Sequence, residues 1–318
     1  MESNRNQKEI TVGVDVGKLF LDIALYPSLE SYRFSNDEKG IKQAIAKLKS
    51  HRPKRIVLEA TGCLGHAFIT EANKASLVVC VVNPKQIYNF AKAIGQQAKT
   101  DKLDAQLIAR FGDSVKPPAT EIKPQVLQRV SDLLACRSQL LAEQTMNKNC
   151  LQSMPKATQG YYKAILKTLK RQLEKLDQQL DKILANTEHY RVTLDILQSV
   201  PGVGKVVSLT LLSYLPELGH LTNKQASSLI GVAPVAKDSG QYKGYRKTSG
   251  GRQQVRTAMY MAMLSGIQCN PVLRAKYQQL LAVGKPKKVA LIACVRKLIV
   301  ILNTMLKHGV KWEPKLAN

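Results

Sequence analysis

The sequence is short of acidic residues and has none of the cysteine patterns that build structural sites. Across 318 residues, 23 Asp and Glu stand against 48 Lys and Arg, which gives a formal net charge of +25. The six cysteines are scattered, with no CxxC pair and no neighbouring histidine pair, so we predict neither a disulfide framework nor a zinc site. This cysteine usage is typical of a reducing cytosol.

Long apolar runs are also missing. The N-terminal MESNRNQKEI lacks the apolar segment of a signal peptide, and runs such as SLVVCVV are far shorter than a membrane span. We therefore expect a cytoplasmic, soluble protein with no membrane partner. With 44% apolar and 22% charged residues the composition is that of an ordinary folded protein, and the length indicates two or three domains.

The positive charge is concentrated near the C-terminus. Residues 191–318 hold 19 basic and 4 acidic side chains, whereas residues 1–120 hold 18 and 12, and residues 121–190 hold 11 and 7. A segment this basic indicates a polyanionic partner, because each Lys or Arg that neutralises a phosphate releases condensed counterions. Nucleic acid is the partner that we expect.

Residues 1–120 alternate short β-rich runs with helical patterns. The alternation predicts strands at 10–17, 19–27, 31–36, 55–62 and 77–84, and helices at 38–50, 64–75, 85–95 and 100–112. Three successive strands followed by strand–helix units predict an α/β domain of the ribonuclease H-like type. In that layout an antiparallel meander is continued by parallel strands, with helices on the faces.

Residues 121–190 carry no strand signal. Five apolar side chains there are spaced 4, 3, 4 and 3 residues apart, which is a heptad seam: Leu169, Leu173, Leu176, Leu180 and Ile183. The seam is compatible with a helical hairpin inside one chain and equally with a dimerising coiled coil.

Residues 191–318 are predicted to be mainly helical. In LQSVPGVGKVVSLTLLSYL, a turn at Pro201, Gly202 and Gly204 separates two helical patterns, which resembles a helix-hairpin-helix element. Its exposed backbone N–H groups and Lys205 are candidates for a DNA phosphate contact. The alternative is a glycine turn that merely joins two core helices.

Two acids open the last predicted helix of the first region. Asp101 and Asp104 lie on one helix face, where like charges repel by a few tenths of a kcal/mol, about 0.2–0.5. A divalent cation would reverse that cost. Asp15, inside the first strand, and Glu59, at the end of the fourth, sit among apolar residues, and in a ribonuclease H-like sheet all four carboxylates converge.

Oxygen ligands of this kind suit Mg²⁺ or Mn²⁺. Each acid also has an ordinary interpretation. Asp15 would be a surface-facing strand residue and Glu59 a helix cap, while Asp101 would be an N-cap with Asp104 in a favourable first turn.

In order along the chain, several motifs resemble the DEDD transposases of bacterial insertion sequences, a family related to Piv-type DNA invertases that includes bridge-RNA-guided recombinases. The resemblance rests on GVDVGK, LEATG, VVNP, KTDKLDA with a downstream RF, SVPGVG, LIGVAPVAKDSG and GGRQQVRTAMYMA, the GGR marking a subgroup. It implies a RuvC-like catalytic domain at 1–120, a coiled-coil assembly segment at 121–190 and a basic transposase domain at 191–318. It further implies that Asp15, Glu59, Asp101 and Asp104 bind metal.

The resemblance also implies a serine nucleophile in the last domain. Ser249 of RKTSGGR is the best match, although its alignment needs a one-residue slip; Thr248 and Ser239 are rivals, and Ser249 is alternatively an N-cap of the helix near Gln253. Cations that flank this serine would offset phosphate charge: Lys243, Arg246, Lys247, Arg252 and Arg256.

The sequence thus predicts a DNA recombinase that uses a serine–DNA intermediate and a Mg²⁺ site. The resemblance implies donor and target DNA, a guide RNA encoded beside the gene, and a homo-oligomer as partners. Two other functions remain open. One is a RuvC-like metal-dependent nuclease or Holliday-junction resolvase without a covalent intermediate, and the other is a non-catalytic nucleic-acid-binding protein.

Overall fold

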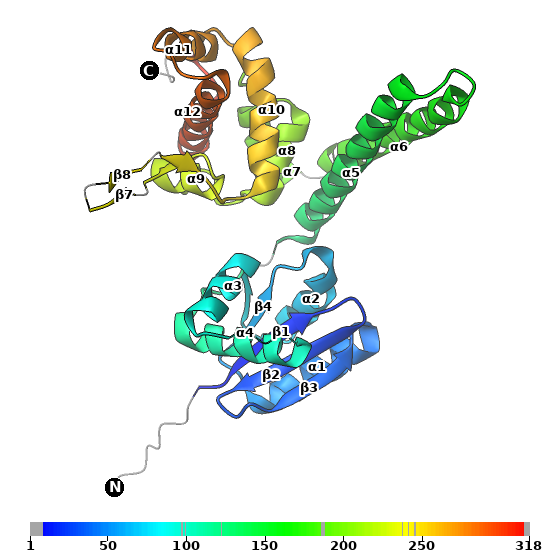
Figure 1. Ribbon diagram of the computed structural model, residues 1–318, viewed down its shortest axis with the longest axis vertical. Helices are drawn as coiled ribbons and strands as arrows, with labels where there is room; N and C mark the ends of the chain where they lie inside the picture. The colour runs from blue at the N-terminus through cyan, green and yellow to red at the C-terminus, as the bar shows by residue number, and fades with distance from the viewer. Residues whose placement is uncertain are drawn as a thin grey trace. The chain divides into compact units, whose positions relative to one another are not determined.

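The chain divides into two compact units, residues 1–122 and residues 123–318. The computed structural model describes residues 9–314, apart from residues 97, 99, 122, 186, 187, 237, 241 and 245. The first unit is an α/β layer structure and the second is mainly helical (Figure 1).

The first unit contains every strand and helix that the sequence predicts there. Its elements are β1 (Thr11–Val16), β2 (Phe20–Tyr26), β3 (Ser31–Ser35), α1 (Glu38–His51), β4 (Arg55–Glu59), the short 3-10 helix η1 (Gly62–Gly65), α2 (His66–Lys74), β5 (Val79–Val82), α3 (Pro84–Ala93) and α4 (Asp101–Val115). Local capping fixes several helix starts. Asp37 accepts a hydrogen bond from the Gly40 amide before α1, and Asn83 accepts one from Lys85 before α3.

The five strands form one mixed sheet in the order β3-β2-β1-β4-β5. β1, β2 and β3 are antiparallel neighbours, whereas β1, β4 and β5 run parallel. This is the antiparallel meander extended by parallel strands that the sequence predicts, so the ribonuclease H-like fold class is confirmed.

Helices cover both faces of this sheet. One face packs on α1 and α2 through a core that includes Val12, Val14, Leu48 and Phe68. The opposite face packs on α3 and α4, and α4 lies across β1, β2 and β4 (Figure 1).

Gly13 permits the close contact between β1 and α4. A Cβ atom at this position would lie 2.2 Å from the Ala105 carbonyl oxygen and 2.3 Å from the Ala109 amide nitrogen. Only glycine accommodates backbone at that distance. The contact fixes α4 at Ala105 and Ala109 against the middle of β1.

The second unit consists of helices and two very short strand pairs. Its elements are α5 (Gln125–Ser153), α6 (Gln159–Ala185), α7 (Glu188–Gln198), α8 (Lys205–Tyr214), α9 (Asn223–Leu229), β6 (Pro234–Val235), β7 (Asp238–Ser239), β8 (Tyr242–Lys243), β9 (Lys247–Thr248), α10 (Gln253–Cys269), α11 (Pro271–Ala282) and α12 (Lys287–His308). β6 pairs with β9 and β7 pairs with β8, both antiparallel.

α5 and α6 run side by side as a long helical pair (Figure 1). Leu169, Leu173 and Leu180 of the heptad seam are buried within the chain. Arg137 on α5 donates to Asp177 on α6 at 2.8 Å, which fixes the register of the pair. The seam therefore serves a hairpin inside one chain, and α5 also packs against α8.

The main hydrophobic core of the second unit is built from residues of α7 to α12. α12 contributes Cys294, Val295, Leu298 and Leu302, all fully or almost fully buried. By length and composition α12 is the one helix among the described residues that could cross a membrane, but 56% of its apolar window is buried inside the fold. Its apolar character is explained by this core.

Candidate active site

The sheet and α4 bring the four predicted acids to one place. Asp15 lies at the end of β1 on the same face as Gly13, because alternate residues of a strand share a face. Glu59 ends β4, one position beyond the parallel pair of Val14 and Leu58. Since α4 crosses this face at Gly13, its first turn comes to the same edge as both strand ends.

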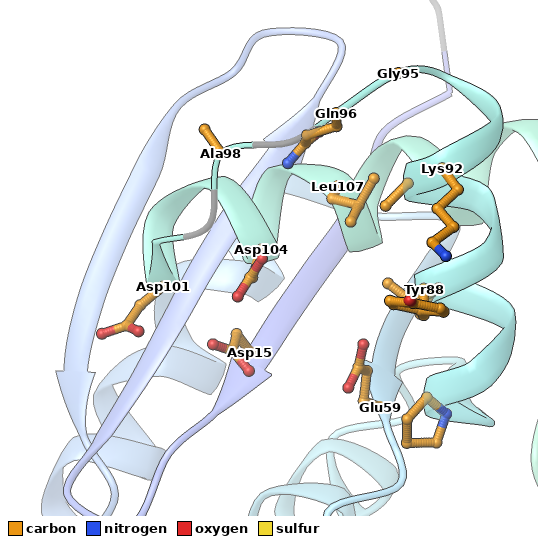
Figure 2. Close-up of a pocket in the computed structure, with 13 residues that line it drawn as sticks. Asp15, Glu59, Tyr88, Lys92, Gly95, Gln96, Ala98, Asp101, Asp104 and Leu107 are labelled. Carbon is orange, nitrogen blue, oxygen red and sulfur yellow. The ribbon is translucent and has the colours of Figure 1, made fainter.

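A pocket of about 930 Å³ opens at this edge, and all four acids line it: Asp15, Glu59, Asp101 and Asp104. Figure 2 shows the Asp104 carboxylate pointing toward Asp15, with Glu59 on the α3 side of the pocket. Asp101 is exposed, and the other three side chains are partly buried.

Asp101 and Asp104 are not helix caps. Thr100 is the N-cap of α4, and its side chain accepts a hydrogen bond from the Leu103 amide at 3.3 Å. Both acids therefore lie in the first turn, where the positive end of the helix dipole favours negative charge. The N-cap interpretation of Asp101 is therefore wrong.

Asp101 points toward Arg33 on β3 and away from the other three acids. Arg33 Nη2 donates to Asp101 Oδ2 at 2.9 Å. The Nε and Nη2 of Arg33 also donate to the two carboxylate oxygens of Asp22, at 2.8 and 2.9 Å. Accordingly, no three Asp, Glu, His or Cys side chains among the described residues already surround a common position for a metal ion.

Asp22 and Arg33 were missed by sequence reasoning. Asp22 lies directly opposite Asp15 across the β1–β2 pair, and Arg33 lies opposite Asp22 across β2–β3. The three side chains therefore form a row on the face that α4 covers. The signal was present, since an acid within the apolar run FLDIALY is as unusual as Asp15 in its own strand.

α3 contributes an aromatic and a basic side chain to the same pocket. Tyr88 is 58% exposed, and Lys92 lies one helical turn later with its Nζ 4.6 Å from the Tyr88 ring centre (Figure 2). An exposed aromatic ring with a cation over it suits stacking on a base or contact with a phosphate. Their spacing of four residues on an exposed helix face was the available sequence signal.

Ser249 lies in the second unit, on the exposed segment between β9 and α10. The N-cap of α10 is Arg252, which makes no side-chain capping bond, so the interpretation of Ser249 as the N-cap is wrong. Thr248 is the last residue of β9, opposite Pro234, and Ser239 ends β7, opposite Tyr242.

The cations predicted around Ser249 have different surroundings. Arg246 and Lys247 are exposed on the segment itself. Arg252 is paired with Glu217, and Arg256 donates from Nη1 to the Gly250 carbonyl. Lys243 lies in β8, and its side chain falls outside the described part of the chain.

The two helices and the turn predicted between them are present as α7, residues 199–204 and α8. Gly202 has φ of +98°, and a Cβ there would lie 2.6 Å from the Gly266 Cα on α10. This glycine is therefore required for packing of the turn against a core helix. Gly204 is the exposed N-cap of α8, and Lys205 forms an ion pair with Asp181.

The sheet order defines the first unit as a ribonuclease H-like domain, and an acidic pocket opens at the edge where β1 and β4 end. A family model described as "Transposase" (DEDD_Tnp_IS110) matches residues 12–159, and the model "Transposase IS116/IS110/IS902 family" matches residues 194–278. The chain belongs to the IS110 family of transposases, and is thus an enzyme of DNA transposition and recombination.

Two relatives extend over nearly the whole chain. The "Pilin gene-inverting protein" of Moraxella lacunata is 25% identical over 323 residues, covering 96% of this chain and 98% of the relative, and that of Moraxella bovis matches to the same extent. An "Insertion element IS110 uncharacterized 43.6 kDa protein" from Streptomyces coelicolor is 30% identical over 128 residues, 38% of this chain and 30% of its own. A Thermus thermophilus RuvC structure in complex with a Holliday junction substrate is matched at 13% identity over 35% of this chain and 99% of that one, with a TM-score of 0.27.

Proposed function

We propose that this chain cuts and rejoins DNA at the borders of a bacterial insertion sequence, with a divalent cation held by the four acids and Ser249 as the nucleophile. The observation that carries the proposal is the pocket at the end of β1, which Asp15, Glu59, Asp101 and Asp104 all line. Family membership supports the DNA substrate, and the full-length similarity to gene-inverting proteins supports site-specific exchange.

The donor set fits Mg²⁺ or Mn²⁺, because all four side chains offer carboxylate oxygens and these are the ligands that such ions prefer. When bound, the cation would supply charge stabilisation to the phosphate oxygens. For Asp101 to join the other acids, its carboxylate has to turn from Arg33 or share one oxygen with it. Tyr88 and Lys92 would hold the nucleic acid beside the acids.

The covalent step needs no co-reactant, because each bond that forms replaces one that breaks. The Ser249 Oγ–phosphorus bond forms, the bond from phosphorus to one deoxyribose oxygen breaks, and the serine proton is lost while the leaving sugar hydroxyl gains one. The resulting phosphoserine ester conserves the phosphodiester bond for rejoining. Exposed Arg246 and Lys247 would offset the charge of the attacked phosphate.

Three further parts of the proposal concern domains and partners. Residues 1–120 would supply the acids, residues 121–190 the contacts between copies in a homo-oligomer, and residues 191–318 the serine and most of the DNA contacts. A structured RNA encoded beside the gene would guide the choice of target. The net basic charge of residues 191–318 supports a nucleic-acid-binding role for that segment.

A trapped covalent adduct tests the serine step. With a nicked substrate, wild-type protein should form a slowly migrating protein–DNA species, and peptide mapping should place the nucleotide on Ser249. Ser249→Ala should lose the adduct and strand exchange but keep DNA binding, because one oxygen is removed and the neighbouring cations remain. Thr248→Ala and Ser239→Ala are the matched controls and should keep the adduct.

The acid variants separate the remaining functions. Asp15→Ala and Asp104→Ala should each abolish strand exchange while the protein stays folded. Metal-dependent cleavage with no adduct in wild type would favour the nuclease or resolvase. DNA binding without any cleavage would favour the non-catalytic protein. An adduct that survives in Ser249→Ala but disappears in Thr248→Ala would show that Thr248 is the nucleophile.

A further inference from the structure

The segment that carries Ser249 is pressed against the turn that ends α9. The Arg252 amide donates to the Leu229 carbonyl at 2.7 Å. A Cβ on Gly231 would lie 2.0 Å from the Gly250 carbonyl oxygen, and one on Gly251 would lie 2.2 Å from the Gly231 amide nitrogen. The two backbones therefore touch directly, and all three glycines have positive φ.

The Arg252 side chain ties the same segment to the end of α8. Its Nη1 and Nη2 donate to the two carboxylate oxygens of Glu217 at 2.7 and 2.6 Å, and Nη1 also donates to the Tyr214 carbonyl at 2.8 Å. Both side chains are about one-third exposed. A forked pair of this geometry fixes direction as well as distance.

The end of α8 is itself held by a hydrogen bond and by core packing. Tyr214 is the last residue of α8, and its hydroxyl donates to the Ser131 carbonyl on α5 at 2.8 Å. Leu211 and Leu215, on either side of Tyr214, are buried in the core of the unit. Glu217 follows this packed helix end, and the ion pair links the Ser249 segment to it.

We propose that Glu217 and Arg252 form a clasp that positions the Ser249 segment for attack on phosphorus, which makes Arg252 a positioning residue and not a phosphate contact. The inference rests on the proposed function of this segment. Four contacts support it: the forked pair, the Tyr214 bond, the Leu229 bond and the glycine interlock. The nearby Arg256 braces the same loop by donating to the Gly250 carbonyl.

Glu217→Gln distinguishes the clasp from a phosphate contact. If Arg252 bound DNA phosphate directly, removal of the neighbouring anion would strengthen DNA binding and leave cleavage unchanged or faster. The clasp instead requires that single-turnover cleavage at saturating DNA slows by about tenfold or more, since a misplacement of 1 Å costs up to about 100-fold. The dissociation constant for DNA should change less than about threefold.

Arg252→Lys provides the second variant. Lysine keeps the positive charge but cannot form the forked pair with Glu217. The chemical step of this variant should therefore slow while its DNA binding is retained. The double variant should be no slower than the worse single variant, because both act on one contact. Lys224→Ala, which removes an exposed cation from α9, is the matched control and should leave the chemical step at saturation unchanged.

A readout without DNA completes the test. Limited trypsin digestion of the full chain should cut after Lys247 at least about threefold faster in Glu217→Gln than in wild type, because the segment opens more often. Wild-type cleavage and trypsin rates in both Glu217→Gln and Arg252→Lys would overturn the clasp. If wild-type protein forms no covalent adduct with DNA, the serine mechanism alone is overturned, since the trypsin comparison still tests the clasp.

Discussion

Arg33 donates a hydrogen bond from Nη2 to Oδ2 of Asp101, 2.9 Å away, across the gap between β3 and α4. The same guanidinium is held in two places by Asp22, so Asp101 is the partner with a single bond. An exposed ion pair of this kind contributes little to stability, so a metal ion can displace it. We therefore expect Arg33 and a bound divalent cation to compete for Asp101.

Arg33→Gln is expected to tighten Mg²⁺ binding, because it frees Asp101 and removes a positive charge from beside the acids. The gain should be severalfold and at most about tenfold. The measurement is the Mg²⁺ concentration that gives half of the maximal rise in melting temperature. Lys42→Gln is the matched control, since it breaks an exposed ion pair with Glu38 on α1 and should leave the Mg²⁺ response unchanged. A weaker response in Arg33→Gln would mean that Arg33 orients Asp101 as a ligand.

Gly13→Ala should destabilise the first unit and disturb the pocket together. The added Cβ would meet backbone atoms of Ala105 and Ala109, which cannot rotate away, so α4 has to move. We expect a loss of about 3 kcal/mol in the free energy of unfolding, at the upper end of overpacking effects. Denaturant unfolding measures it. Gly160→Ala on α6 meets no atom within 4 Å and should stabilise by no more than about 1 kcal/mol.

The layers of the first unit could be predicted from the sequence, because strands and helices alternate there in pattern. That four acids line one pocket could also be predicted, because an acid inside an apolar strand is unusual. Asp22 gave the same signal, but its meaning depends on the strand register that places it beside Asp15 and Arg33. Periodicity alone does not reveal such cross-strand neighbours.

The second unit was predicted less completely. Arg252 stands in a basic run, which indicated a phosphate contact, whereas its partner Glu217 is 35 residues earlier and is brought near only by the packing of α8. Likewise, the helical pair α5–α6 and the C-terminal helices were expected as separate regions, yet they fall in one compact unit because α5 packs on α8.

The contribution of the Glu217–Arg252 pair to stability should vanish in acid. Hydrogen bonding to Arg252 lowers the pKa of Glu217 below its ordinary value of 4.5. The unfolded chain therefore binds this proton first, so the contribution is full above about pH 4.5 and is lost as the pH falls below it. The difference in melting temperature between wild type and Glu217→Gln should accordingly be largest near pH 7. A difference that does not shrink toward pH 4 would show that the pair contributes no charge-dependent stability, which is expected to be at most about 1 kcal/mol.

DNA affinity should depend steeply on salt, and the exposed cations beside Ser249 should account for part of that slope. Each phosphate contact contributes about 0.9 to the slope of log affinity against log salt concentration. Arg246→Ala combined with Lys247→Ala should therefore reduce the slope by about 1.8, measured by fluorescence anisotropy between roughly 50 and 200 mM salt. Lys42→Ala, which removes an exposed cation from α1, is the control and should leave the slope unchanged. If the double variant keeps the full slope, the cations beside Ser249 do not contact phosphate, and the basic surface that binds DNA lies elsewhere in residues 191–318.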